Sequence, residues 1–521
     1  MRPALWHPPV APSAAEQAII KRIRRAKLFV FLRDYRHELF NDAFQEELAT
    51  LYRDSPVGQP PTPPAQLALA TILQAYSGVS DDEVIEATTM DRRWQLVLDC
   101  LDCTEPPFSK GTLVGFRQRL IVQQLDRRLI ERTIELAAQA GTFGSRQLRA
   151  ALDSSPLWGA SRVEDTFNLL GHALRKALGS IARKPGRELT EIAAEAGASL
   201  VSGSSLKAAL DLDWDDPPQR GQALMTMLHT LEQVEGWLGT TPPGSAHPQV
   251  SASLAAAQQV RQQDVEVTAE GSPALRRKVA KERRITVEDA QMRHGRKSKH
   301  QRIDGYKRHV LQDLDTGLVR AVGVTPANAP EATVTEGIEA DLAAQSVQLA
   351  ELHLDRAYLS SQLVRTRPPH LLIYCKAWPV RNGGRFPKTA FSLDWQRQRL
   401  RCPNEVELPF DPGGVVHFPA ATCAACPLRE RCTTSAHGRS VTIHPDERLL
   451  WELRQRQLTP QGRAKLRERI MVEHGLAHIG HWQGRRARYR GARKNLFDLR
   501  RSAVVQNLHV IARLPAMLKV A

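Results

Sequence analysis

The sequence predicts an α/β protein in which a mixed sheet is interrupted by helical and Cys-rich insertions and is preceded by an all-α domain. Short apolar runs typical of strands alternate with helical patterns, which is the pattern of a sheet covered by helices. The chain of 521 residues can bury several cores, so about two to four domains are expected. The predicted strands are 147–153, 306–312, 318–325, 347–354 and 370–375.

The N-terminal part of the chain is predicted to be helical. A Pro-rich arm with a basic amphipathic stretch occupies residues 1–60, and helical periodicity covers residues 61–145. Ser80 and Glu83 have the spacing of a capping box, which begins a helix. Short helices separated by tight turns suit either a DNA-reading helix-turn-helix or a plain helical bundle that packs on the next domain. The sequence favours neither alternative.

The rest of the chain divides into core segments and insertions. Asp315-Thr-Gly317 is a hairpin signal between two of the predicted strands. An Ala/Leu/Gln-rich stretch and a Pro/Gly-rich stretch with several cysteines interrupt the strand pattern. The expected order is a first core segment (146–169), a helical insertion (170–284), a second core segment (285–376), a Cys-rich insertion (377–450) and basic C-terminal helices (451–521).

Three acidic residues form the candidate catalytic site. Asp153 and Asp355 each follow a short apolar run, and Glu473 lies in a basic helical stretch. Carboxylates at strand ends meet at one edge of a sheet, where their oxygens can hold Mg²⁺. Two such ions, roughly 4 Å apart, can activate a water and stabilise the leaving oxygen of a phosphodiester. Taken singly, each aspartate is more often a cap or turn former, and Glu473 has an alternative partner in Arg469, four residues earlier.

The charge of the chain predicts an anionic partner. Lys and Arg number 72 against 56 Asp and Glu, which gives a formal net charge of +16. Such a surplus favours nucleic acid or another anionic surface, although a basic enzyme with no such partner is the alternative. Residues 485–494 hold six cations around one tyrosine, which favours binding to the phosphate backbone over a merely solvated face.

The sequence also predicts the compartment. No apolar run approaches the roughly 18 residues that a transmembrane helix requires, and the first residues lack the apolar segment of a secretory signal. Seven cysteines, an odd count in a long chain, do not indicate a disulfide framework. We therefore expect a reducing, cytoplasmic setting and no membrane partner.

Four cysteines within a Pro/Gly-rich stretch form a candidate zinc site. Cys402 stands alone, whereas Cys423, Cys426 and Cys432 follow one another closely. Thiolate clusters of this kind suit tetrahedral Zn²⁺. The alternative is a set of buried free cysteines.

Several strings resemble the bacterial insertion-sequence transposases of the DDE type. The matching strings are Asp153-Ser-Ser-Pro, Asp304-Gly-Tyr306-Lys, Thr325-Pro-Ala-Asn328, Leu354-Asp355-Arg-Ala-Tyr358, Arg469-x-x-x-Glu473, Arg488-Tyr-Arg-Gly491-Ala-Arg-Lys494 and Gln506-Asn507-Leu508. The resemblance implies a ribonuclease-H-like catalytic core in which Asp153, Asp355 and Glu473 hold two Mg²⁺ ions. It also implies that the protein acts as a homodimer on double-stranded DNA in the bacterial nucleoid. Such a dimer would cut the terminal inverted repeats and join the freed 3′-hydroxyl to target DNA.

The chain departs from this family at two positions. The family often has a tyrosine three residues before the arginine and a lysine or arginine seven residues after the glutamate, but Leu466 and Gly480 stand there. The cation that grips the terminal strand is therefore expected at Arg485, Arg486 or Lys494. The full set of expected DNA-contacting residues is Arg356, Arg469, Arg485, Arg486, Arg488, Arg490, Arg493 and Lys494.

Two rival functions remain open. A domesticated or inactive relative would keep the DNA-binding surface without strand transfer. A stand-alone Mg²⁺-dependent nuclease would cut DNA but would never join an end to target DNA.

Overall fold

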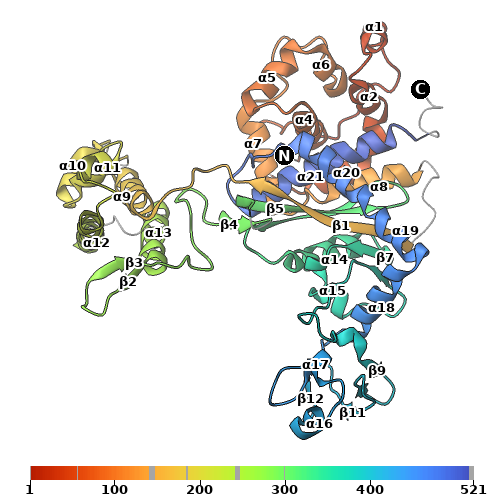
Figure 1. Cartoon of the computed structure of the whole chain (residues 1–521). Coiled ribbons are helices and arrows are strands. Elements are labelled where there is room, and N and C mark those ends of the chain that lie inside the picture. Colours follow the sequence, from red (N-terminus) through yellow and green to blue (C-terminus); the bar gives the residue numbers. More distant parts are fainter. Residues whose placement is uncertain are drawn as a thin grey trace.

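A mixed six-stranded sheet forms the centre of the computed structural model (Figure 1). The structure describes residues 2–54, 57–139, 147–183, 186–240, 247–297 and 300–514. Figure 1 shows the N-terminal helices on one side of the sheet and the Cys-rich insertion beyond the opposite side. The helical insertion stands apart from the sheet. None of the described helices is both long and apolar enough to cross a membrane.

The sheet is antiparallel on one side of its central strand and parallel on the other. The central strand β1 pairs antiparallel with β5 and parallel with β7, and β8 extends the parallel side. Both β4 and β6 pair antiparallel with the outer side of β5. The bounds are β1 (Gln147–Trp158), β4 (Arg293–Arg296), β5 (Arg302–Asp313), β6 (Val319–Pro326), β7 (Gln348–Leu354) and β8 (Leu372–Tyr374).

The predicted mixed α/β class and all five predicted strands are confirmed. Gly317 has a φ of 76° in the turn between β5 and β6, a conformation that glycine adopts without steric cost. The expectation that Asp153 ends its strand is wrong, because β1 continues to Trp158. The polar string after Asp153 stays extended because β5 pairs with it as far as Gly305, whereas pairing with β7 stops at Leu152.

The N-terminal helices pack on the sheet rather than standing alone. They share one hydrophobic core with the C-terminal helices and with one face of the sheet, as the bundle alternative expects. Ser80 and Glu83 form the predicted capping box. The bounds are α1 (Ala14–Arg22), α2 (Lys27–Leu39), α3 (Asp42–Ala49), α4 (Pro64–Ser77), α5 (Asp81–Met90), α6 (Arg92–Leu98), α7 (Lys110–Val122), α8 (Arg128–Gln139), α20 (Ile470–Gln483) and α21 (Ala492–Ile511).

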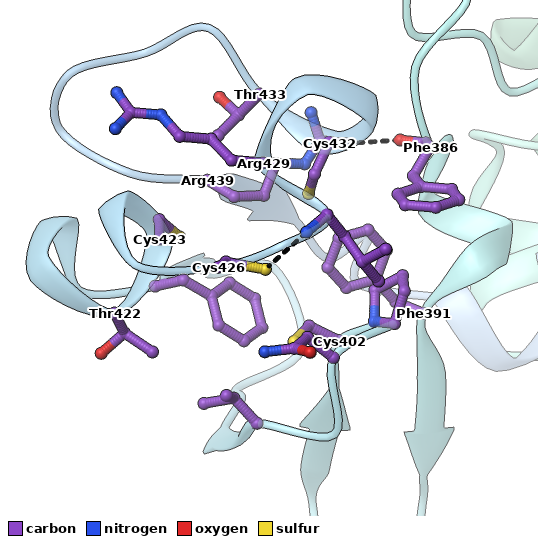
Figure 2. A pocket seen from close by; sticks show the side chains of 15 residues that line it. Phe386, Phe391, Cys402, Thr422, Cys423, Cys426, Arg429, Cys432, Thr433 and Arg439 are labelled. Atoms are coloured by element: carbon purple, nitrogen blue, oxygen red, sulfur yellow. Dashed lines mark hydrogen bonds between the residues drawn. The ribbon is translucent and has the colours of Figure 1, made fainter.

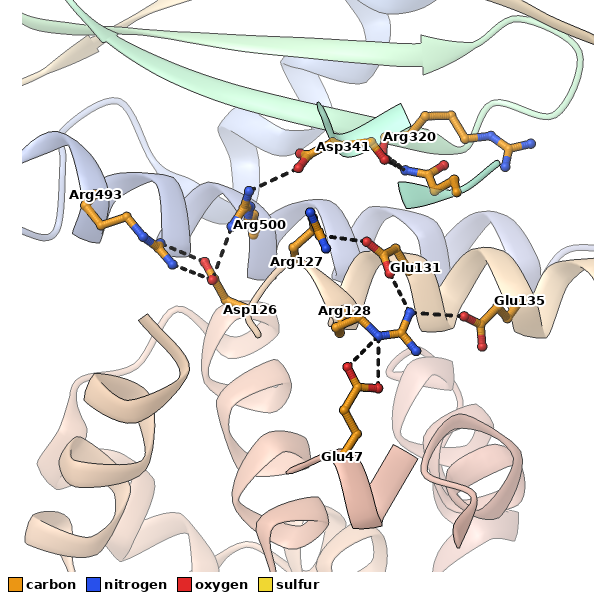
Figure 3. A network of polar contacts seen from close by, with 11 residues as sticks. Glu47, Asp126, Arg127, Arg128, Glu131, Glu135, Arg320, Asp341, Arg493 and Arg500 are labelled. Carbon is orange, nitrogen blue, oxygen red and sulfur yellow. Dashed lines mark hydrogen bonds and ion pairs between the residues drawn. The ribbon is translucent and has the colours of Figure 1, made fainter. Parts of the chain in front are cut away.

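A buried ionic network joins these helices (Figure 3). Asp126, just before α8, is completely buried and accepts hydrogen bonds from Arg493 and Arg500 of α21. Arg500 also reaches Asp341 on the other side of α21. A buried carboxylate is tolerated only when it is paired and hydrogen-bonded, so these contacts fix α21 against the N-terminal helices.

The opposite face of the sheet has a core of its own. Apolar side chains of β1, β5, β6 and β7 pack there against short helices. A further helix, α19, then leads to α20. The bounds are α14 (Thr335–Ala344), α15 (Gln362–Arg365), α18 (Glu447–Leu458) and α19 (Pro460–Glu468).

Each insertion has its own apolar core. The helical insertion contains α9 (Thr166–Ala182), α10 (Leu189–Glu195), α11 (Leu206–Leu210), α12 (Pro217–Thr240), α13 (Pro248–Asp264) and a hairpin of β2 (Val265–Val267) and β3 (Pro273–Leu275). The Cys-rich insertion contains β9 (Ser392–Asp394), β10 (Arg399–Arg401), β11 (Glu407–Pro409), β12 (Val415–His417), β13 (Ser440–Thr442), α16 (Ala420–Ala424) and α17 (Arg429–Cys432). The helical insertion lies between β1 and β4, and the Cys-rich insertion lies between β8 and α18, so neither adds a strand to the central sheet.

Candidate active site

Asp153, Asp355 and Glu473 lie around one pocket. Side chains alternate along β1, and Ala151 belongs to the core beneath α20, so Asp153 faces α20 as well. Leu152 pairs with Leu354, which places Asp355 beside Asp153 at the next position of the parallel pair. Helix α20 crosses this face and brings Glu473 to the same place. The structure therefore gathers three carboxylates from two neighbouring strands and one helix.

The pocket is open and has a volume of about 770 Å³. Its lining combines the three carboxylates with several cations, so it can hold both cations and a polyanion. The residues around it are Asp153, Ser154, Ser155, Lys297, Arg308, Asp355, Arg469, Glu473, Leu476, Ala477, Gly480, His481 and Arg485.

Arg469 bridges two of the carboxylates. Its Nη2 donates to Oε1 of Glu473 at 2.7 Å, and its Nη1 contacts Oδ2 of Asp153. The alternative partner expected for Glu473 is therefore present, and the same guanidinium serves Asp153. Burial raises the pKa of Asp153 against the effect of Arg469, and the charges of Asp355 and Glu473 raise it further. A cation that enters the pocket would therefore stabilise the ionised form of Asp153.

A buried hydrogen-bond chain holds the turn that follows Asp355. Oδ1 of Asp355 accepts from the amide of Arg356 at 2.7 Å and begins a 3₁₀ turn that ends at Tyr358. The Tyr358 hydroxyl lies 2.7 Å from Nδ1 of His309, and Nε2 of His309 lies 2.9 Å from the hydroxyl of Thr325. Burial lowers the pKa of His309 to about 3, so the ring is neutral near pH 7. These hydrogen bonds fix the position of Asp355 relative to the β5–β6 hairpin.

A second group of possible metal ligands adjoins the pocket. One ligand atom from each of Glu351, His353 and Glu468 lies within 4.8 Å of the other two. Lys465 contacts Oε2 of Glu351 at 3.0 Å, and Arg149 contacts both glutamates. Arg149 also pairs with Asp315, so two cations offset part of the charge of three carboxylates, and the network ties β1, β7 and α19 together. Glu351 and His353 share the face of Asp355 by their spacing along β7, a signal that the sequence reasoning missed.

The basic residues expected to contact DNA have diverse surroundings. Arg485 lines the pocket, and Arg356 directly follows Asp355. Lys494 is exposed on α21 and has no side-chain hydrogen bond or ion pair with any described residue. These three side chains are available to an external ligand.

Four other arginines of the basic run contact the protein itself. The Nε of Arg486 donates to the carbonyl of Gly159 at 3.1 Å. Arg490 forms an ion pair with Glu288. Arg488 donates to the carbonyls of Gly78 and Val79 at 2.9 and 2.7 Å, and Nη1 of Arg493 donates to Oδ2 of Asp126 at 2.8 Å. The run therefore also joins the C-terminal segment to other parts of the fold.

The four candidate zinc-binding cysteines lie around one apolar pocket (Figure 2). The Sγ of Cys426 accepts from the amide of Leu428 at 3.4 Å. Burial raises the pKa of Cys432, Arg439 opposes this effect, and the other three thiols add to it. Tetrahedral zinc would bring the sulfurs to about 3.8 Å from one another. Among the described residues, only the group around His353 has three ligand atoms within 4.8 Å, so the thiols are gathered less tightly than zinc requires.

Comparisons with known proteins found two similar families. A model described as "Transposase DDE domain" matches residues 412–512, which contain Glu473 and the basic run. A model described as "Transposase domain (DUF772)" matches residues 20–119, which form most of the N-terminal helical region. No curated protein and no solved structure matched the chain significantly. Asp153 and Asp355 lie outside both matched ranges.

Proposed function

Because this chain belongs to the insertion-sequence transposases of the DDE type, we propose that it cuts DNA at the ends of its element and joins the freed 3′-hydroxyl to target DNA. The family implies a DNA substrate. The observation that supports this chemistry is the meeting of Asp153, Asp355 and Glu473 at one open pocket with a basic rim.

The strand order supports a ribonuclease-H-like core. As the resemblance implies, the two aspartates of such a core lie on adjacent strands, and the glutamate is carried by a helix. β1, β7 and α20 supply the three carboxylates of this chain in that arrangement. β5 pairs antiparallel with both β1 and β6, so the sheet is mixed, as this proposal requires.

The donor chemistry of the three carboxylates suits Mg²⁺, although their oxygens do not all lie within 4.8 Å of one another. Carboxylate oxygens are hard donors of the kind that Mg²⁺ prefers, and a guanidinium already bridges two of these groups. Asp153, Asp355 and Glu473 would hold two ions, as the resemblance implies. When bound, Mg²⁺ lowers the pKa of a water and stabilises the charge on the leaving oxygen.

The other residues of the pocket position the substrate and the carboxylates. Arg469 contacts Asp153 and Glu473 and offsets part of their negative charge. Arg485 lines the pocket and Arg356 directly follows Asp355, and both would bind backbone phosphates without reading sequence. Tyr358 and His309 fix the backbone that carries Asp355. We expect two copies to act on the paired terminal repeats, as the resemblance implies.

We also propose that the Cys-rich insertion binds one structural Zn²⁺ through Cys402, Cys423, Cys426 and Cys432. The gathering of these thiols at one pocket supports this proposal. Because the thiols are not yet at ligand spacing, zinc would draw the surrounding loops together.

The test is a cleavage and joining assay on a duplex that carries the terminal sequence of the encoding element. Asp153→Asn, Asp355→Asn and Glu473→Gln should each lower both reactions about a thousandfold or more, because a lost metal ligand removes several kcal/mol of transition-state stabilisation. The control is Glu336→Gln, an exposed glutamate of α14 outside the pocket, which should keep full activity.

The outcomes separate the proposal from its rivals. Cleavage without joining by the wild-type chain would identify a nuclease, and binding without cleavage would identify an inactive DNA-binding relative. Full activity in any of the three carboxylate variants would remove that residue from the proposed site.

A further inference from the structure

Arg308, which lines the pocket, is a buried cation without a carboxylate partner among the described residues. Its side chain belongs to β5 and is only 5% exposed. Its Nε donates to the hydroxyl of Ser155 at 2.8 Å, and its Nη1 donates to Oε1 of Gln483 at 3.1 Å and to the carbonyl of Gly484 at 2.9 Å. All these acceptors are neutral. Among the described residues, Nη2 has no acceptor.

Such a placement is costly unless an anion compensates it. Removing an unpaired charge from water is strongly unfavourable. Burial accordingly lowers the pKa of Arg308 to about 10; the charge of Asp498 opposes this effect, but Asp498 makes no hydrogen bond with Arg308. The open side of this guanidinium is the pocket of the three carboxylates.

Helix α20 has a glycine, Gly480, where it passes over the guanidinium of Arg308. A Cβ on Gly480 of α20 would lie 3.1 Å from Nη2 and 3.6 Å from Cζ of Arg308, which is tighter than an ordinary contact. Glycine at this position therefore leaves the space that the guanidinium occupies.

Arg308 also lies on the same face as the catalytic candidates. Arg308 pairs with Ser155, which is two residues beyond Asp153 on β1. The side chains of Arg308 and Asp153 therefore point to the same side of the sheet, at positions about 7 Å apart along the strand direction. Arg469 is already engaged by Asp153 and Glu473. Arg308 is thus a cation of the pocket that no carboxylate neutralises.

We propose that Nη2 of Arg308 binds a non-bridging oxygen of a phosphate in the DNA strand that enters the pocket. The DNA ligand rests on the proposed function. A guanidinium held by neutral acceptors keeps its full charge and presents its remaining donors in a fixed plane, which suits a phosphate. Gly480 allows this contact because it leaves the space open.

The test uses the full-length chain with Arg308→Gln and measures affinity for an element-end duplex at several salt concentrations in Ca²⁺. Loss of one phosphate contact should weaken binding about tenfold to hundredfold and reduce the slope of log K against log salt by about 0.9. The matched control is Arg187→Gln, an exposed arginine of the helical insertion that pairs with Glu191 and Glu195, which should change neither quantity.

A scan with neutral methylphosphonates identifies the phosphate. At one position near the cut, the neutral linkage should weaken binding to the wild-type chain but should have no further effect on Arg308→Gln, because the two changes remove the same contact. Gly480→Lys in the Arg308→Gln background should restore the salt slope, since it supplies the cation from the helix.

If Arg308→Gln unfolds at a temperature too low for the binding assay, Gly480→Ala provides a second variant. Its added methyl group should displace the guanidinium and weaken binding while all charges remain. A folded variant with the wild-type salt slope and methylphosphonate profile would overturn the inference. If the wild-type chain binds the duplex but does not cut it, the proposed function is contradicted, whereas the binding measurements still test the phosphate contact of Arg308. A wild-type chain that binds no DNA would overturn both.

Discussion

His309 makes the stability of the molecule depend on pH. Burial lowers its pKa to about 3, whereas the unfolded chain has the ordinary value of roughly 6.5. The unfolded state therefore binds a proton that the folded state refuses, and folding stability must fall as the pH falls from about 6.5 towards 3. The expected loss from this residue is about 2 kcal/mol between pH 7 and pH 5, as measured by urea unfolding.

The control for this prediction replaces the ring by an amide. His309→Gln keeps hydrogen-bonding groups near Tyr358 and Thr325 but cannot take up the proton, so its unfolding free energy should change less between the two pH values. His437→Gln, at an exposed position, should behave like the wild type. Equal pH dependence in all three proteins would contradict the assignment.

Some residues of the site are predictable from their neighbours and others are not. Asp355 and Glu473 stand in short strings whose pattern is local, so the sequence indicates them. Arg308 looks like any cation of a strand, because its neighbours in the chain do not reveal that Gly480 lies above it. Its unpaired burial results from contacts between segments that are distant in sequence.

At the scale of elements, Arg493 and Lys494 are neighbours on α21 with different expected roles. Arg493 pairs with the completely buried Asp126 (Figure 3), whereas Lys494 is exposed. Arg493→Gln should lower the free energy of unfolding by about 2–3 kcal/mol, because Asp126 loses one of its two cations. Lys494→Gln should leave stability unchanged but reduce the salt slope of DNA binding by about 0.9. Urea unfolding and DNA titration of both variants test this pair.

The reverse pattern would show that Arg493 faces the DNA and that Lys494 supports the fold. The variant Asp126→Asn offers an independent check on the first half. It keeps the shape of the side chain but removes the charge, so it should destabilise the protein without changing the number of phosphate contacts. An unchanged unfolding free energy in Asp126→Asn would exclude the structural role of this pair.

Element boundaries show the same limit of sequence reasoning. The β5–β6 hairpin is predictable, because alternating apolar residues surround a local turn signal at Gly317. The extension of β1 beyond Asp153 is not predictable, since Ser154-Ser-Pro156 has no strand pattern and is held extended by β5. The density of a charge run likewise does not reveal which of its members have partners on other elements.

At the scale of the whole molecule, the Cys-rich insertion has a much smaller apolar core than the helical insertion. Its strands are three residues long, and its core is a small cluster that includes Phe391, Leu400 and Phe418. Small units of this kind usually need a metal or another cross-link. We therefore expect the full-length protein to be purified with one Zn²⁺ per chain and to melt at a lower temperature after chelation, as determined by elemental analysis and calorimetry.

The position of the insertion extends this consequence to the proposed active site. The insertion lies between β8 and α18, and α18 is followed by α19 and by α20, which carries Glu473. Cys423→Ser should therefore remove the zinc, lower the melting temperature and reduce cleavage, whereas Cys103→Ser, exposed and outside the cluster, should change none of these. Zinc restored to the chelated wild type should recover all three quantities. If the reduced protein contains no zinc and added Zn²⁺ leaves its melting curve unchanged, the four residues are free cysteines, and the insertion must be held by its apolar contacts alone.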